Sequence, residues 1–145
     1  MSSESYESEQ QFRLIVEAAP NGILLVDETG AIMMANASVL LQFGYERKEL
    51  LGKSVEMLLP GPSRLEHRQH RAGFMKAPQA RSMGGGRELF GLRKDGSEFA
   101  VEIGLTPIQT IKGMGVVASI VEEAEAILQM LGQMLGRRLG ARGEA

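Results

Sequence analysis

The residues that could bind a metal or act in catalysis lie in the middle of the chain, where Ser63 precedes His67 and a second histidine follows at His70. Two histidines make no zinc site without a third ligand, and none is evident in the sequence. Ser63 and His67 stand about one helical turn apart, yet no oxyanion loop and no orienting acid at a meaningful spacing completes a catalytic triad. The run Gly84-Gly85-Gly86-Arg87 lacks the Gly-Lys-Ser/Thr ending of a phosphate-binding loop. The sequence therefore predicts a protein that is not an enzyme.

Composition limits the class of protein further. The 145 residues fit one domain, and 43% hydrophobic with 23% charged residues is typical of a soluble globular chain. A net charge of -2, with the cations spread along the chain, argues against a nucleic-acid binder. The absence of cysteine excludes disulfides, thiolate zinc sites, iron–sulfur clusters and cysteine nucleophiles. The start is too polar for a signal peptide and no apolar run approaches the roughly 20 residues of a membrane span, so we expect a cytoplasmic protein.

The first elements that would position such residues are a helix and a hairpin. Residues 1–8 are expected to be disordered, and apolar spacing predicts a helix over 9–19. Two apolar runs, 23–26 and 31–35, flank the turn sequence Asp27-Glu28-Thr29-Gly30 and predict a β-hairpin.

Short helices are predicted next. Asn36 is expected to cap a helix that Gly44 ends. Further helical segments are expected over 46–51, 55–59 and, after the break at Pro60-Gly61-Pro62, 64–76.

Three strands follow, over 88–93, 98–108 and 116–121, with the first two joined by a turn around Asp95-Gly96. The order predicts an α+β fold with an antiparallel sheet of about five strands. The short helices inserted between the second and third strands would form a ligand pocket against one face of the sheet.

The last segment, 123–139, has the spacing of a coiled-coil seam at Ala124, Leu128, Leu131 and Leu135. The predicted N-terminal helix also has an apolar face, made of Phe12, Ile15 and Val16. We therefore expect a homodimer through both terminal helices. Glycines at every fourth position from Gly132 allow close helix approach or, alternatively, a fraying end, and residues 140–145 are expected to form a loose tail. A basic helix that lies on a membrane is a further alternative.

A series of short motifs resembles bacterial PAS domains in order and spacing over residues 9–122. Each motif is weak alone, but independent turn and cap positions agree. The motifs are Asn21-Gly22-Ile23, Asp27-Glu28-Thr29-Gly30, Asn36-Ala37-Ser38, Phe43-Gly44-Tyr45, Glu49-Leu50-Leu51-Gly52 and Arg93-Lys94-Asp95-Gly96-Ser97.

The resemblance implies a five-stranded sheet with helices on one face, and signalling between a pocket and the flanking helices, usually in a dimer. Many PAS domains leave the last strand through an Asp-Ile-Thr-like triplet that couples the sheet to the outgoing helix. This chain has Glu122-Glu123-Ala124 instead, so Glu122 would take the place of the aspartate and no hydroxyl follows.

Local similarity to the haem-binding PAS domains of rhizobial oxygen-sensor kinases begins at Leu59-Pro60-Gly61-Pro62-Ser63. It implies that His67 would be the axial ligand of a haem iron and that Arg87 would be the distal arginine that senses oxygen. Imidazole and guanidinium suit these roles. It also implies pocket walls at Val101, Ile103 and Leu105.

The same residues also have plainer interpretations. His67 stands in a very polar run, typical of a solvated or capping histidine, and Arg87 would simply pair with an acid such as Glu66. The expectation for the pocket is no cofactor, with haem b as the main alternative and a flavin after it. Photochemistry through a flavin–cysteine bond is excluded because the chain has no cysteine.

Three functions remain open at this point. The first is a sensory and dimerisation module that relays a pocket or partner signal through its terminal helices. The second is a haem-based gas sensor, and the third is a ligand-free scaffold for protein interactions. No kinase, cyclase or DNA-binding segment is present in the sequence, so the chain is expected to be part of a larger sensor or a regulator that acts on a separate signalling protein.

Overall fold

In the computed structural model, residues 3–64, 67, 69, 71, 73, 81, 82, 89–123, 131, 132 and 134–136 are described. Their strands form one antiparallel sheet in the order β2-β1-β6-β5, with β4 and β3 along the remaining edge of β5. The strands are β1 Gly22–Asp27, β2 Ile32–Ala35, β3 Arg81–Ser82, β4 Leu89–Leu92, β5 Glu98–Thr110 and β6 Gly113–Glu122.

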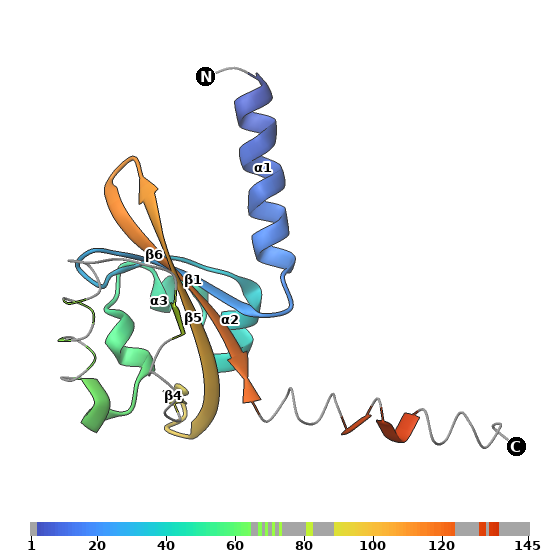
Figure 1. Cartoon of the computed structure of the whole chain (residues 1–145), viewed down its shortest axis with the longest axis vertical. Coiled ribbons are helices and arrows are strands. Elements are labelled where there is room, and N and C mark those ends of the chain that lie inside the picture. Colours follow the sequence, from blue (N-terminus) through green and yellow to red (C-terminus); the bar gives the residue numbers. More distant parts are fainter. Residues whose placement is uncertain are drawn as a thin grey trace, which may run out of the picture.

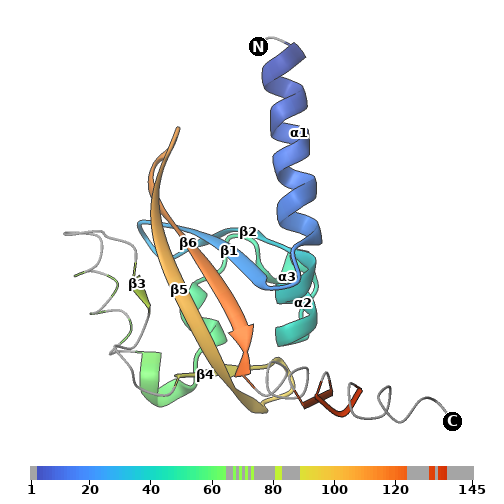
Figure 2. The ribbon, with the colours of Figure 1, turned by 45° about the vertical axis from the view of Figure 1, so that its right-hand side comes forward.

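Helices lie on one face of this sheet, while the first helix points away from it (Figures 1 and 2). The long helix α1 leads into β1, and shorter helices follow β2 along the chain. They are the α-helices α1 Ser3–Ala18, α2 Ala37–Phe43 and α3 Arg47–Leu50, and the 3-10 helices η1 Val55–Leu58 and η2 Gly61–Ser63. The architecture is therefore α+β, as predicted.

The hydrophobic core fills the space between the sheet and the short helices. Alternate residues of β1, β5 and β6 point into it, which is the period-2 pattern of a sheet with one covered face. The core consists of Leu24, Val26, Phe99, Val101, Ala118 and Ile120 from these strands, Ile32 and Ala35 from β2, and Val39, Phe43, Leu50 and Leu58 from the helices.

Two cap predictions are confirmed at the ends of α2. The Asn36 side chain accepts a hydrogen bond from the Val39 amide, and Gly44 has the left-handed φ of 79° that ends a helix most easily at glycine. The predicted turn between β1 and β2 also forms. There the Thr29 hydroxyl donates to Asp27, which holds the pKa of that carboxyl below its ordinary value.

Some predicted boundaries need correction. Helix α1 begins at Ser3 rather than at residue 9, so residues 3–8 are helical and not disordered. The acidic residues Glu4, Glu7 and Glu9 suit the positive end of a helix dipole, which explains the earlier start. The two-residue strand β3 was not predicted, because two residues are too short for a period-2 pattern to be recognised.

Strands β5 and β6 are also longer than predicted, and they form a hairpin that extends past β1. β1 pairs with β6 no further than Gly115, whereas β5 and β6 remain paired up to Thr110 and Gly113. Ile111 at the tip is fully exposed. Among the described residues, no helix is both long and apolar enough to cross a membrane.

Candidate functional site

The buried side chain of Asn36 joins the incoming helix to the sheet. Its Nδ2 donates to the carbonyl oxygens of Val16, 2.8 Å away, and Asn21, 3.0 Å away. Its Oδ1 accepts from the backbone amides of Ile23 at 2.9 Å and Val39 at 3.2 Å. One amide group that is 1% exposed therefore ties together the end of α1, the linker, β1 and α2.

Two further contacts hold the end of α1. The Ser38 hydroxyl on α2 donates to the Ala19 carbonyl at 2.7 Å. Arg47 on α3 donates through Nη2 to both carboxylate oxygens of Glu17, at 2.7 and 2.9 Å, and through Nε to the Ala35 carbonyl. The last turn of α1 is thus fixed to the domain, and the rest of the helix extends from this anchor (Figure 2).

The other end of α2 holds the outgoing strand. Gln42 donates through Nε2 to the carbonyl of Ile120 at 3.1 Å. Arg93, which follows β4, donates through Nη1 to the Gln42 carbonyl at 2.6 Å and through Nη2 to the Glu122 carboxylate at 2.8 Å. The end of β6 is therefore attached to α2 by two routes. We call Asn36, Gln42, Arg93 and Glu122 the α2 junction.

An aromatic pair links the α2 junction to the core. The guanidinium carbon of Arg93 lies 4.0 Å from the centre of the Phe99 ring, a cation–π distance. Phe99 in turn meets Phe43 edge to face, with ring centres 5.0 Å apart. A side-chain carbon at Gly91 would stand 2.9 Å from both rings, so glycine is needed for this packing. A change in the position of Phe99 would therefore reach Arg93 directly.

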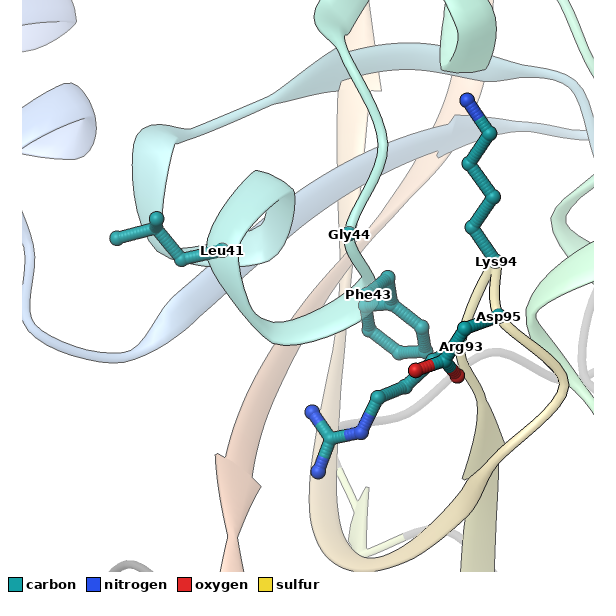
Figure 3. A pocket seen from close by; sticks show the side chains of 6 residues that line it. All are labelled: Leu41, Phe43, Gly44, Arg93, Lys94 and Asp95. Carbon is teal, nitrogen blue, oxygen red and sulfur yellow. The ribbon is translucent and has the colours of Figure 1, made fainter.

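Phe43 and Arg93 also border an open depression of about 610 Å³ on the surface. Figure 3 shows Arg93 beside the Phe43 ring, with Lys94 and Asp95 on the adjoining turn and Leu41 directed away from them. Lys94 pairs with Glu49 at 2.7 Å, which raises the pKa of the lysine. The pKa of Glu49 is lowered first by the hydrogen bond that its carboxylate accepts from the Glu46 backbone amide and then by Lys94. The depression is thus open to solvent, and its cations Arg93 and Lys94 already have carboxylate partners.

A second polar cluster surrounds Glu56 on η1. The Glu56 side chain is only 2% exposed. The carboxylate accepts from the Ser54 hydroxyl at 3.0 Å and pairs with the Arg71 guanidinium, and Nδ1 of His67 lies 3.8 Å from its Oε1. Arg64 donates through Nε to the backbone carbonyls of Glu56 and Leu59. Arg64, His67 and Arg71 are all helical, and their spacing places them on one helix face. This face is directed toward η1.

The predicted pocket residues are only partly brought together. Val101 is buried in the core, and Ile103 and Leu105 pack against the core from the same face of β5. His67 is 18% exposed and lies beside Glu56. Arg87 lies outside the described residues.

The predicted interface residues differ in exposure. Phe12 and Ile15 are 62% and 69% exposed, and Leu131 and Leu135 are also exposed. Val16 is 7% exposed and buried within the chain itself, so it offers little surface to a second copy. Ala124 and Leu128 lie outside the described residues.

Sequence reasoning did not single out Gln42, Glu56 or Arg93 as functional residues. Arg93 was noted only as part of a turn motif, and its approach to Glu122 depends on strands that are distant in sequence. Glu56 had a weak signal, since it is a single acid in an otherwise apolar run from Val55 to Leu59.

Comparison with known proteins agrees with this architecture. A family model described as the PAS fold matches residues 10–120. The PAS domain of an HTR-like protein from Haloarcula marismortui superimposes with a TM-score of 0.70 at 22% identity, covering 83% of this chain and 95% of that one.

Two curated relatives match part of the chain. The sensor protein FixL of Bradyrhizobium diazoefficiens is 27% identical over 102 residues, which cover 70% of this chain and 20% of FixL. The oxygen sensor protein DosP of Escherichia coli is 30% identical over 87 residues, which cover 60% of this chain and 11% of DosP. This chain thus spans a fifth or less of these two relatives. Since the PAS model covers most of the chain and the strands and helices follow the PAS order, the protein belongs to the PAS family.

Proposed function

We propose that this PAS domain is a non-catalytic sensory module of cytoplasmic signal transduction, and that it relays a signal between its core and its two terminal segments through α2. The observation that carries the proposal is the position of α2 in the α2 junction. Asn36 at one end of α2 holds α1, and Gln42 at the other end holds β6. A seven-residue helix thus contacts both connections of the domain.

The relay begins at the aromatic pair. A ligand or partner that favours a different packing of Phe99 and Phe43 also changes the support of the Arg93 guanidinium. Arg93 is bonded to both Gln42 and Glu122, so this change alters how α2 and the end of β6 are held together. Two states that differ in this way would be populated according to their affinity for the signal.

Replacing Arg93 with alanine is expected to loosen the end of β6. The charged guanidinium of Arg93 donates one hydrogen bond to a carboxylate and one to a backbone carbonyl, worth together about 2 kcal/mol or more. The backbone amides of residues 120–123 should then exchange hydrogen at least tenfold faster, measured by NMR or mass spectrometry. Lys94→Ala is the matched control, because Lys94 is the neighbouring cation but pairs with Glu49. Equal protection of residues 120–123 in both variants and the parent would contradict the relay.

A haem-based gas sensor is the second candidate, supported by the position of His67. Its Nδ1 lies 3.8 Å from Glu56, and a carboxylate near one ring nitrogen is the usual support of a histidine that binds metal through the other. The position of His67 beside Glu56 therefore fits an axial ligand of haem. His67 would hold the iron, Arg87 would face the gas, and Val101, Ile103 and Leu105 would contribute apolar wall. Bound haem supplies an iron that takes up diatomic gases.

The haem candidate is tested by absorption spectroscopy of protein expressed with iron and haem precursor. A Soret band that disappears in His67→Ala and persists in His70→Ala would support it, because only the first variant removes the proposed ligand. A folded parent protein without a Soret band would rule out haem and leave the relay through α2 as the proposed function.

We also propose that the module forms a homodimer through its terminal segments. Phe12 and Ile15 are largely exposed on α1, and Leu131 and Leu135 are exposed after the last strand. Replacing Leu128 and Leu131 with glutamate should halve the mass measured by sedimentation, because charged groups would replace the apolar seam. Leu41→Glu is the control, since Leu41 is 84% exposed but lies on α2. An unchanged mass in the double variant would argue against this interface.

A further inference from the structure

Gln42 of the α2 junction uses only half of its side-chain amide. Its Nε2 donates to the Ile120 carbonyl at 3.1 Å, but its Oε1 is buried and has no hydrogen-bond partner among the described residues. The reverse orientation of the amide would bring Oε1 to the Ile120 carbonyl, and two acceptors would then face each other. The unpartnered oxygen therefore follows from this packing, although buried polar groups in folded proteins are nearly always hydrogen-bonded.

This oxygen lies against the first residue of β1. A side-chain carbon at Gly22 would collide with Gln42 Oε1, so glycine leaves the room that the amide needs. Gly22 pairs with Ile120, the residue whose carbonyl Nε2 already holds, and the two form the end pair between β1 and β6. The Gln42 amide thus stands beside the end of the strand pairing, with one polar atom for each strand.

Strand geometry decides which backbone groups meet in this end pair. Ile23 directs its backbone toward Asn36, because its amide donates to Asn36 Oδ1 and its carbonyl accepts from the Asn36 amide. Backbone groups alternate in direction along a strand, so those of Gly22 point the other way, toward Ile120. The Ile120 carbonyl therefore holds the Gly22 amide, and opening of the pair frees that amide beside Gln42 Oε1.

We propose that the second state of the relay is an opened Gly22–Ile120 pair in which the Gln42 amide bonds both strands. In this state Nε2 still donates to the Ile120 carbonyl, and Oε1 accepts from the Gly22 amide that the opening has released. The hydrogen bond that Oε1 gains offsets one that the strands lose, so this pair opens more easily than an ordinary strand end. The inference rests on the proposed relay and names the movement that separates its incoming and outgoing connections.

The contact between Arg93 and Glu122 keeps the pair closed. Glu122 is the last residue of β6 and follows Ile120 closely, so its bond to Arg93 at 2.8 Å restrains the end of that strand. The same guanidinium donates to the backbone carbonyl of Gln42, the residue whose side chain bonds the open pair. A signal that weakens the contacts of Arg93 would therefore shift the population toward the open pair.

The test is hydrogen exchange of the Ile120 amide in the full chain, because opening of the pair exposes this amide. Gln42→Met keeps an unbranched side chain of similar length but removes both polar atoms. The bond from Nε2 to Ile120 is lost from both states, whereas only the open state loses a bond to Gly22. The Ile120 amide should therefore exchange about fivefold more slowly than in the parent. Dividing its rate by that of the Leu24 amide, in the middle of the same strand pairing, removes any change in global stability.

Leu41→Met is the matched control, because Leu41 is the neighbouring residue on α2 and is 84% exposed, and exchange at Ile120 should stay as in the parent. If Gln42 only braced the closed strands, Gln42→Met would accelerate exchange at Ile120. That result, or an unchanged rate, would overturn the proposal. Arg93→Ala loosens residues 120–123 under the relay whichever second state follows. Acceleration in both Arg93→Ala and Gln42→Met would therefore reject the opened pair and keep the relay.

Discussion

Asn36→Ala is expected to lower the free energy of unfolding by about 3 kcal/mol, which is close to a 10 °C fall in melting temperature for a domain of this size. The substitution removes the cap of α2, worth about 1 kcal/mol. It also removes the partner of the Val16 carbonyl in a buried bond, and of the Ile23 amide and the Asn21 carbonyl in two partly buried bonds. Urea unfolding followed by circular dichroism measures the change.

Asn36→Asp separates the two roles of the side chain. The carboxylate still accepts from the amides of Ile23 and Val39, but it donates nothing to the carbonyls of Val16 and Asn21. The carboxylate oxygen that replaces Nδ2 would also stand close to both carbonyl oxygens, so we expect a loss of stability no smaller than in Asn36→Ala, together with faster proteolysis within α1. A loss below 1 kcal/mol in Asn36→Ala would show that Asn36 does not hold α1 to the sheet.

Glu56→Ala is expected to destabilise the domain by about 3 kcal/mol. Glu56 is 2% exposed and pairs with Arg71, so its removal leaves the Arg71 guanidinium without its buried carboxylate. Breaking a buried ion pair typically costs 3 kcal/mol or more, and the 21% exposure of Arg71 favours the lower end of that range. Chemical unfolding of the variant gives the value.

A surface ion pair provides the control for Glu56. Glu17 and Arg47 lie 2.7 Å apart but are 48% and 44% exposed, so Glu17→Ala should cost less than about 1 kcal/mol. If Glu56→Ala and Glu17→Ala lowered the free energy of unfolding equally, burial would not explain the contribution of the Glu56 cluster to stability.

Much of the fold followed from short-range signals in the sequence. Asn36 and Gly44 marked the ends of α2 because an amide cap and a left-handed glycine satisfy helix ends by local chemistry. The turn between β1 and β2 was recognised from residues that hydrogen-bond to their own backbone. β5 was expected to end at Ile108, but it continues to Thr110, because β6 pairs with it up to Gly113.

The candidate site could not be predicted in the same way. Arg93 and Glu122 form their contact only after β4 and β6 have joined β5, so no local pattern marks it. Family resemblance did suggest that Glu122 would replace an aspartate. His67 was noticed for its chemistry, whereas its neighbour Glu56 was not, because burial of a single acid depends on a cation from another element.

The pairing of Gly22 with Ile120 has a consequence for how such a domain is carried by other proteins. Neighbouring strands are about 5 Å apart, so the chain enters and leaves the domain almost at one point. A unit of this kind can be inserted into a surface loop of a host without forcing the loop open. Any rearrangement at the α2 junction would then act on the host as a change in the separation of two adjacent anchor points.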